Sequence, residues 1–369
     1  MKFKRMPIEI EAPEQMGYAN IRYNLTESSY TDSFLKDLDI NLSDLELCYG
    51  NHIGHEKLRE LLAKEEGLKA QDVLLTPGAA GALFFIANTF LNKGDRLLVE
   101  FPNYGTNIET PRTLGAELDF IEVSLETNFM PSLAQIKEKI TPQTKLISLT
   151  VPHNPTGTCV SLEFLKSVIA LSEDKKIPLL VDETYRDMNF DNQLPTAASL
   201  STNVISVSSL SKTYGLPGIR LGWLFCQNQE WMEQFLAVKE QVVICGSMAD
   251  EEIAYQFLLK KEKHLKRIKE SILTRRKILC DWLVKEKNIE AVTPVAGVVC
   301  FPRIKNISDS QLDFFYKILN SKYGTYVGPG HWFAMDKRYM RLGYGWPKDA
   351  DLKQGLENIS LCLQESLSR

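Results

Sequence analysis

A single lysine lies among small hydroxyl residues at the end of an apolar run, in the order Ser209, Leu210, Ser211, Lys212. A lysine that attacks a carbonyl must first lose its proton, and a confined, partly desolvated site favours that loss. Arg220, eight residues later, carries a planar guanidinium that suits two phosphate oxygens at once. This spacing indicates a lysine that holds a phosphorylated aldehyde cofactor; a surface loop with two ordinary cations is the alternative.

A turn of small residues provides a second candidate phosphate contact. Gly78, Ala79 and Ala80 follow the strand-like run 72–76 and lead into a helical segment. The N–H groups at the start of a helix bind phosphate, helped by the helix dipole. A glycine turn that only reverses the chain is an equally good interpretation of these residues alone. The turn matches neither Gly-X-Gly-X-X-Gly nor a P-loop, so no dinucleotide or ATP site is predicted here.

Two further predicted strands are followed by side chains that could contact a cofactor, one an aromatic ring and the other an amide. Tyr104 follows the predicted strand 96–101, where its ring could stack on a flat heteroaromatic cofactor. Asn154 lies between two prolines after the predicted strand 145–151, and it could donate a hydrogen bond to a ring oxygen. A packed tyrosine and a simple sharp turn are the alternatives, and the neighbouring His153 is expected to be exposed.

A carboxylate follows the apolar run 177–181. Burial of the charged Asp182 side chain at the end of a strand costs free energy unless the carboxylate meets a cation or hydrogen-bond donors. If it faced a pyridine nitrogen, it would keep that nitrogen protonated, as an electron-sink cofactor requires. Tyr185, three residues later, could donate to the same ring oxygen as Asn154. The alternative is an aspartate that caps the next helix.

The elements that must position these residues form a repeating pattern. Short apolar, β-branched runs alternate with helical segments, which predicts an α/β fold with a large, mostly parallel seven-stranded sheet sandwiched by helices. In such sheets, functional residues lie in loops at the carboxyl ends of the strands. The predicted strands are 72–76, 96–101, 117–123, 145–151, 177–182, 204–210 and 220–226.

The pattern changes after residue 226. Residues 248–287 have helical spacing and predict one long helix or a broken helical pair; a strand-like run (292–301) and a last helix (349–368) follow. We interpret the second part as a smaller α+β domain that the N-terminal segment completes. The predicted division is an N-terminal arm with part of the small domain (1–44), a large cofactor-binding domain (45–285) and a small C-terminal domain (286–369).

The composition is that of an ordinary soluble globular protein, with 369 residues, 44% hydrophobic, 24% charged and a net charge of -4. There is no basic excess for nucleic acid or a membrane surface. The N-terminus lacks the apolar part of a secretory signal, and no stretch reaches membrane-spanning length. Seven scattered cysteines without a Cys-X-X-Cys pair indicate a reduced, cytoplasmic location, and we predict no metal site.

The candidate residues follow one another in a set order, each at a separate strand end. In this order the chain resembles the fold-type I pyridoxal-phosphate enzymes, and more closely the class I/II aminotransferases related to aspartate aminotransferase. The resemblance extends from about residue 49 to about residue 345. Its most specific parts are Asn-Pro-Thr-Gly at 154–157 and Ser-Leu-Ser-Lys at 209–212 with Arg220.

The resemblance implies a role for each candidate. Lys212 would bind pyridoxal 5'-phosphate as an internal aldimine and then move the proton between the substrate α-carbon and the cofactor. Asp182 would pair with the pyridinium nitrogen. Asn154 and Tyr185 would hydrogen-bond the phenolic oxygen, and Tyr104 would stack on the ring. The implied phosphate cup consists of Gly78, Ala79, Ala80, Ser209, Ser211 and Arg220.

The resemblance also implies a substrate contact. Arg341 matches the small-domain arginine that clamps the α-carboxylate of the substrate, and Asn154 is also implied to bind the substrate. Arg338 is a local competitor, but in an extended segment residues 338 and 341 face opposite sides. Two departures from the family pattern bear on the site: Ala80 replaces a common Ser or Thr, and the segment 328–341 is short.

A tyrosine at the start of the matching region implies a shared site. In this family a tyrosine ahead of a Gly-X-X-X-Leu-Arg segment reaches the phosphate bound by the neighbouring subunit. Tyr49, before the segment 54–59, resembles it and implies a homodimer; core packing is the alternative.

The resemblance implies an aminotransferase that moves an amino group between an amino acid and a 2-oxo acid. A lyase or cyclase similar to capreomycidine synthase, acting on a modified amino acid, is the alternative. A third hypothesis is an effector-sensing module, as in regulators that fuse this fold to a DNA-binding domain. The short segment before residue 49 and the mild acidity of the chain do not favour it.

Overall fold

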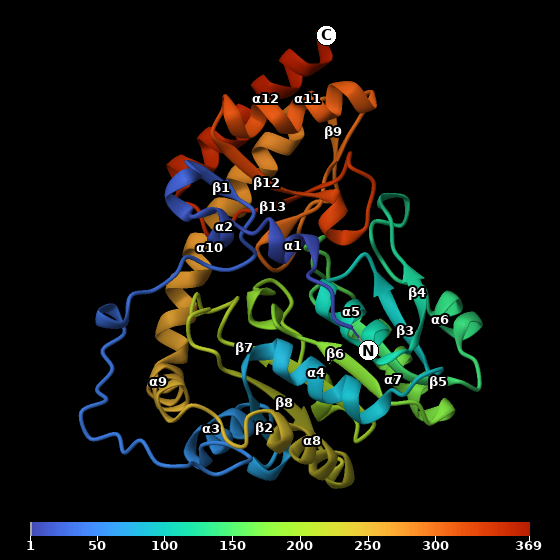
Figure 1. Cartoon of the computed structure of the whole chain (residues 1–369), viewed down its shortest axis with the longest axis vertical. Helices are drawn as coiled ribbons and strands as arrows, with labels where there is room; N and C mark the ends of the chain where they lie inside the picture. The colour runs from blue at the N-terminus through green and yellow to red at the C-terminus, as the bar shows by residue number, and fades with distance from the viewer. Residues whose placement is uncertain (1) are drawn as a thin grey trace.

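The computed structural model describes residues 2–369. Its largest sheet has seven strands in the order β2-β8-β7-β6-β5-β3-β4, of which only β8 runs antiparallel to its neighbours (Figure 1). All seven predicted strands are present, so the predicted sheet is confirmed. The strands are β2 (Val73–Thr76), β3 (Arg96–Phe101), β4 (Glu117–Glu122), β5 (Thr144–Thr150), β6 (Leu179–Asp182), β7 (Val204–Ser209) and β8 (Gly222–Cys226).

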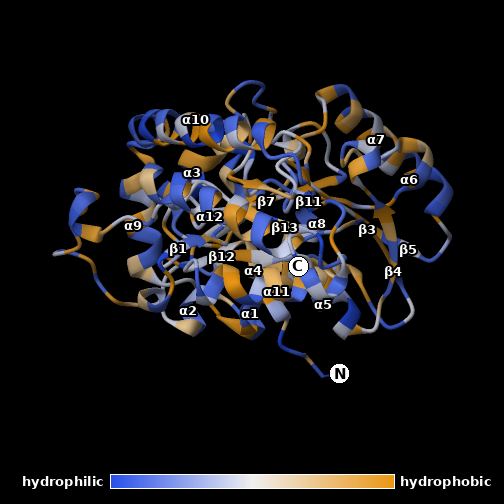
Figure 2. Cartoon of the chain, turned by 90° about the horizontal axis from the view of Figure 1, so that it is seen from above, coloured by the Kyte–Doolittle hydropathy of each residue, from blue (hydrophilic) through white to orange (hydrophobic). Residues whose placement is uncertain are grey.

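Helices cover both faces of this sheet because its strands are apolar on both sides. Leu146 of β5 packs in one core cluster with Ile86 of α4, whereas the next residue, Ile147, packs on the opposite face with Val168 of α7. Figure 2 shows hydrophobic residues concentrated on the strands and mixed polar and apolar residues on α10. The helices around the sheet are α3 (Glu56–Glu65), α4 (Gly78–Phe90), α5 (Gly105–Leu114), α6 (Leu133–Lys139), α7 (Leu162–Lys175) and α8 (Gln229–Val242).

A second, four-stranded sheet joins the two ends of the chain. Its order is β1-β12-β13-β10, with β1 (Tyr23–Leu25) parallel to β12 (Thr325–Pro329) and β13 (Met340–Gly343) antiparallel to both β12 and β10 (Val299–Cys300). The N-terminal segment therefore completes the smaller sheet, as predicted. Two further helices, α11 (Asp309–Ser321) and α12 (Asp349–Leu367), pack against each other beside it.

The predicted strand 292–301 is largely wrong. Only the two residues of β10 pair within it, and a two-stranded ribbon, β9 (Ile289–Glu290) with β11 (Arg303–Ile304), flanks it. Pro294 has no N–H for a strand ladder, and Gly297 has a φ of +67°, outside the strand region.

Of the two alternatives predicted for residues 248–287, the structure shows the broken helical pair. It consists of α9 (Met248–Leu258) and α10 (Lys261–Lys285). Among the described residues no helix combines the length and the apolar character needed to cross a membrane. Two short helices, α1 (Pro7–Ile10) and α2 (Pro13–Met16), lie between the two sheets (Figure 1). The 3-10 helices are η1 (Tyr18–Asn20), η2 (Leu35–Asp37), η3 (Ala70–Asp72), η4 (Leu125–Thr127), η5 (Arg186–Met188), η6 (Ala197–Ser199) and η7 (Gly330–Phe333).

Candidate active site

A cavity of about 370 Å³ lies between the carboxyl edge of the large sheet, the small sheet and the two N-terminal helices. Arg220 reaches this edge although it precedes a strand, because the antiparallel β8 begins where β7 ends: Gly222 pairs with Ser209. Gly78 and Tyr49 are the two candidates that do not line the cavity. Those that do are Ala79, Ala80, Tyr104, Asn154, Asp182, Tyr185, Ser209, Ser211, Lys212, Arg220 and Arg341.

One end of the cavity gathers groups that bind phosphate. The Arg220 Nη1 atom donates to Ser211 Oγ at 3.2 Å, and the Ser211 N–H donates to Ser209 Oγ at 3.3 Å. Helix α4 starts beside them without a side-chain cap on its first N–H groups. At Gly78, which has a φ of +71°, a Cβ atom would lie 2.6 Å from Arg220 Nη2. The glycine therefore leaves room for the guanidinium, although it does not itself line the cavity.

A buried carboxylate lies at the end of β6. Asp182 is 6% exposed, and its Oδ1 accepts hydrogen bonds from the Thr184 N–H at 3.1 Å and the Thr184 hydroxyl at 2.6 Å. Asn107 Nδ2 donates to Oδ2 at 3.4 Å. Burial raises the pKa of Asp182, which these donors only partly oppose. Asp182 does not cap η5, whose N-cap is Tyr185. A cation facing this carboxylate would stabilise its charged form.

Lys212 is held by the N-terminal segment. Its Nζ donates to Ser28 Oγ at 3.1 Å, and its carbonyl accepts from the Tyr30 N–H at 2.8 Å. Burial, and next the Arg341 cation, lower the pKa of Lys212, whereas Glu27 raises it. The amine thus loses its proton more readily than in water, which a nucleophilic lysine requires.

Arg341 points into the cavity from β13. It is 4% exposed; Nη2 donates to the Thr26 carbonyl at 2.8 Å and Nη1 to Asn154 Oδ1 at 3.3 Å. Its Nε–H has no partner among the described residues. Arg338, in contrast, is bound to Asp336 on the exposed side. Of the two residues, Arg341 lines the cavity and Arg338 does not; Arg338 lies in the turn before β13, so the extended segment assumed for both does not include it.

The predicted donors to a ring oxygen have partners within the chain. The Tyr185 hydroxyl donates to the Ser28 carbonyl at 2.8 Å. Because the Asn154 carbonyl oxygen accepts from Arg341, its Nδ2 atom is the amide group left to donate into the cavity. Tyr104 lines the same space, and its N–H donates to Asn103 Oδ1 at 2.7 Å.

One expectation from the sequence, for His153, is wrong, and the alternative interpretation of Tyr49 as a core residue is excluded. His153 is not exposed: it is 4% exposed, Nδ1 lies 2.8 Å from Thr156 Oγ1, and burial lowers the pKa of its imidazole to about 4. Tyr49 does not pack in the core, since 81% of its surface is exposed.

Several residues of the site were missed in the sequence. Ser28 contacts Lys212 across 184 residues, and no local pattern signals that contact. Thr184 could have been found, because an Asp-X-Thr sequence allows the carboxylate to accept from the backbone two residues later. The others are Asn103, Asn107 and Thr150, of which Asn103 Oδ1 accepts from both Asn107 and Thr150.

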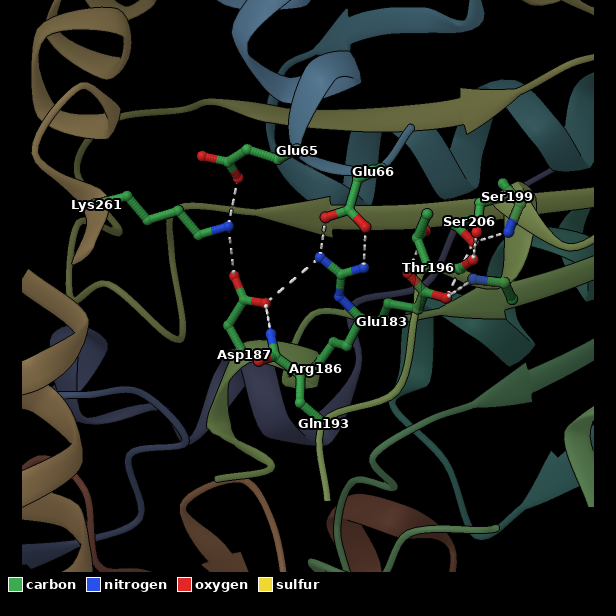
Figure 3. A network of polar contacts seen from close by, with 12 residues as sticks. Glu65, Glu66, Glu183, Arg186, Asp187, Gln193, Thr196, Ser199, Ser206 and Lys261 are labelled. Atoms are coloured by element: carbon green, nitrogen blue, oxygen red, sulfur yellow. Dashed lines mark hydrogen bonds and ion pairs between the residues drawn. The ribbon is translucent and has the colours of Figure 1, made fainter. Parts of the chain in front are cut away.

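A polar network fixes the segment that follows Asp182. Arg186 binds the Glu66 carboxylate with two nitrogens, and Lys261 joins Glu65 at 2.6 Å to Asp187 at 3.3 Å (Figure 3). In the same view Glu183 accepts hydrogen bonds from the hydroxyl groups of Thr196 at 2.7 Å and Ser206 at 3.0 Å. The Ala197 N–H also donates to the Glu183 carboxylate, at 2.5 Å. Because these charges are paired and hydrogen-bonded, the network attaches the loop after Asp182 to helices α3 and α10.

Comparison with known proteins decides the family. The profile described as "Aminotransferase class I and II" matches residues 26–359. The chain belongs to this family. An aspartate aminotransferase of Sulfurisphaera tokodaii is 26% identical, with 88% of this chain and 83% of that protein covered. For the capreomycidine synthase of Streptomyces vinaceus the identity is 28%, and the coverages are 84% and 79%.

A solved structure supports the same assignment for this class I and II aminotransferase. The PLP-dependent aminotransferase of Streptococcus suis 89-1591 superposes with a TM-score of 0.90, at 26% identity and over 99% of each chain. Pyridoxal phosphate is thus the cofactor of this aminotransferase. The residues present fit it, since the phosphate-binding groups and the buried carboxylate lie in one cavity with a lysine beside them.

Proposed function

We propose that the cavity is the active site, in which the aminotransferase moves an amino group between an amino acid and a 2-oxo acid. The observation that carries the proposal is the grouping of Lys212, Asp182, Arg220 and Arg341 around one enclosed space. The phosphate would lie at Arg220, Ser209, Ser211 and the start of α4, and Asp182 would face the ring nitrogen. The experiment that tests the function supplies an amino acid to the loaded enzyme and measures the 2-oxo acid released.

Lys212 performs the proton chemistry in this proposal. When bound, pyridoxal phosphate supplies a carbonyl carbon that takes up the amino group and an electron-withdrawing ring. The Lys212 amine removes the proton from the substrate α-carbon, and its lowered pKa makes the free base available. Ser28 Oγ, 3.1 Å from Nζ, orients the amine. Asp182 would hold the cofactor by pairing its carboxylate with the ring nitrogen, which would favour the charged form of Asp182.

Arg341 and Asn154 orient the substrate. The unpartnered Nε–H and the neighbouring Nη atoms of Arg341 provide two parallel donors for the α-carboxylate. Trp332 lines the cavity, and the Phe333 ring lies 5.1 Å from the guanidinium carbon, so aromatic side chains exclude water on this side. Because Ala80 offers no hydroxyl, the phosphate would be bound by backbone N–H groups and Arg220 on the α4 side.

We further propose that the enzyme is a homodimer with shared sites. Leu47, Tyr49, Val242 and Ile244 are exposed, although each is hydrophobic. The two segments that carry these residues are close together, since His52 of the first pairs with Glu240 of the second at 2.6 Å. The segment before α3 stands away from the rest of the chain (Figure 1). A second copy that covers this region would bury the apolar groups and bring Tyr49 to the partner's phosphate.

The dimer proposal predicts that two damaged subunits complement each other. Tyr49→Ala should lower kcat/KM about tenfold, because a hydrogen bond to a charged phosphate is lost. In a hybrid of a Tyr49→Ala chain with a Lys212→Ala chain, one of the two sites combines both native residues. Co-expressed, differently tagged subunits should therefore recover activity above that of either variant alone. A monomer by light scattering, or a hybrid no more active than the Tyr49→Ala enzyme, would contradict shared sites.

The domain division and the location are also proposals. The boundaries 1–44, 45–285 and 286–369 are supported by the two sheets, because the small one takes its strands only from the two end segments. A cytoplasmic location is supported by the cysteines: all seven are free within the described chain.

A lyase or cyclase reaction on a modified amino acid is the second candidate function. The identity of 28% to the Streptomyces vinaceus capreomycidine synthase favours keeping it. Both reactions begin with removal of the α-proton by Lys212, so the site residues alone do not separate them. The fate of the amino nitrogen does, because only transamination leaves it on the cofactor.

A further inference from the structure

Three carboxylates of the cavity have no role in the proposed reaction. The charged lining consists of three cations, Lys212, Arg220 and Arg341, and four carboxylates. The cofactor and the α-carboxylate of the substrate account for the cations and for Asp182. The remaining carboxylates are Glu9, Glu14 and Glu27.

These glutamates lie on the substrate side of the cavity. Glu27 follows β1 and is close enough to both Lys212 and Arg341 that each lowers its pKa, although burial raises it more. Its Oε1 accepts from Tyr18 at 3.2 Å and from Asn24 at 3.4 Å. Glu9 and Glu14 come from α1 and α2, the short helices between the two sheets (Figure 1).

In the part of the chain that the structure describes, none of the three glutamates has a cation in direct ion-pair contact; Glu9 and Glu27 are half-buried, whereas Glu14 is exposed to solvent. Within residues 2–369, none of them forms a salt bridge, whereas the neighbouring Glu11 lies 2.8 Å from His331. Carboxylates that remain near one another without a partner repel each other and any further anion. A positive group between them would be attracted by all three.

Arg341 independently indicates a ligand in this space. Arg341 lines the cavity and is 4% exposed, yet its Nε–H has no hydrogen-bond partner among the described residues. A buried donor of this kind calls for an acceptor, which the α-carboxylate supplies. The side chain of a substrate whose α-carboxylate binds Arg341 would then lie near Glu27.

We propose that the substrate amino acid carries a second positive charge, an amine or a guanidine, on its side chain, and that Glu27 binds it with help from Glu9 and Glu14. The inference rests on the proposed function, because it assumes an amino acid held by Arg341. A dicarboxylic substrate would add a fourth negative charge to this region. A neutral side chain would leave Glu27 without a direct ion-pair partner.

Binding of unreactive analogues tests this proposal without turnover. Amino acids with an α-methyl group have no α-proton to lose, so their dissociation constants can be measured with the pyridoxal-phosphate enzyme by calorimetry and by the change in cofactor absorbance. The probes are α-methylornithine and α-methylarginine as cations, α-methylnorleucine as the neutral analogue of similar length, and α-methylglutamate as the anion. The wild-type enzyme should bind at least one cation about 30-fold more tightly than the neutral analogue.

Substitution of the glutamates locates the preference. Glu27→Gln should weaken binding of the cationic analogue about tenfold or more and change binding of α-methylnorleucine less than about twofold. Glu9→Gln and Glu14→Gln should have smaller effects of the same sign. Glu138→Gln, an exposed change on α6, serves as the matched control and should alter neither constant.

The outcomes separate this inference from the function on which it rests. Equal or tighter binding of the neutral or anionic analogue by the wild-type enzyme would overturn the inference, as would equal losses for all ligands in Glu27→Gln. If norleucine or glutamate yields oxo acid efficiently and ornithine and arginine do not, the inference fails and the function stands. If no amino acid of any charge binds or reacts, the proposed function itself fails.

Discussion

Lys212→Ala should lower the rate of amino-acid conversion by about 10⁴-fold or more. Alanine can neither bond to the cofactor nor carry the α-proton, and among the described residues Lys212 is the single lysine that lines the cavity. The rate is measured as the initial formation of 2-oxo acid at saturating cofactor. Lys212→Arg should be as inactive, because it keeps the positive charge but stays protonated.

A covalent readout distinguishes this loss from misfolding. Borohydride treatment should fix the cofactor to the peptide that contains Lys212 in the wild-type protein, and should fix none in Lys212→Ala. The variant should still bind the cofactor reversibly through Arg220 and Asp182, with a melting temperature close to that of the wild type. Turnover within tenfold of the wild type, or cofactor fixed to another lysine, would remove Lys212 from its central role.

Arg341→Leu should lower kcat/KM for amino acids by about 10²- to 10³-fold. Among the described residues Arg341 is the one arginine that the small sheet directs into the cavity, and its loss leaves the substrate carboxylate without its paired donors. Most of the loss should appear in KM and in the binding of α-methyl analogues, because Arg341 contacts the part of the substrate that does not react.

The chain offers a matched control for this change. Arg338 lies three residues earlier, is exposed and pairs with Asp336 at 2.8 Å. Arg338→Leu should therefore leave kcat/KM within about twofold of the wild type. If the two variants lose activity equally, Arg341 acts through the stability of the small sheet and does not bind the substrate.

The sequence predicted most of the large sheet and its site because parallel strands place their carboxyl ends at one edge. Tyr104, Asn154 and Asp182 each follow such a strand, so their convergence needed only the order of the elements. Arg341 was favoured over Arg338 by the resemblance to the family, whereas the alternation of an extended segment indicated only that one of the two could point into the site. Arg341 is 4% exposed in β13, whereas Arg338 lies in the exposed turn before this strand and pairs with Asp336.

The features that could not be predicted from the sequence depend on contacts between segments that are far apart in the chain. Ser28 meets Lys212 only because β1 pairs with β12 and carries the N-terminal segment over the sheet edge. The role of Glu27 depends on the same packing. His153 was misjudged because its turn is covered by other elements, and turn composition says nothing about what covers it. The strand at 292–301 failed at Gly297, whose positive φ no hydropathy pattern predicts.

The fate of the amino nitrogen in a single turnover distinguishes transamination from a lyase or cyclase reaction. The loaded enzyme is mixed with an α-¹⁵N amino acid and no oxo acid, and the products are counted per site. The account predicts one 2-oxo acid per Lys212 site, with the label retained on the cofactor until a second oxo acid removes it as a new amino acid. Repeated turnover without an oxo acid, with release of labelled ammonia or of a product that keeps its α-nitrogen, would contradict transamination and establish the lyase or cyclase reaction.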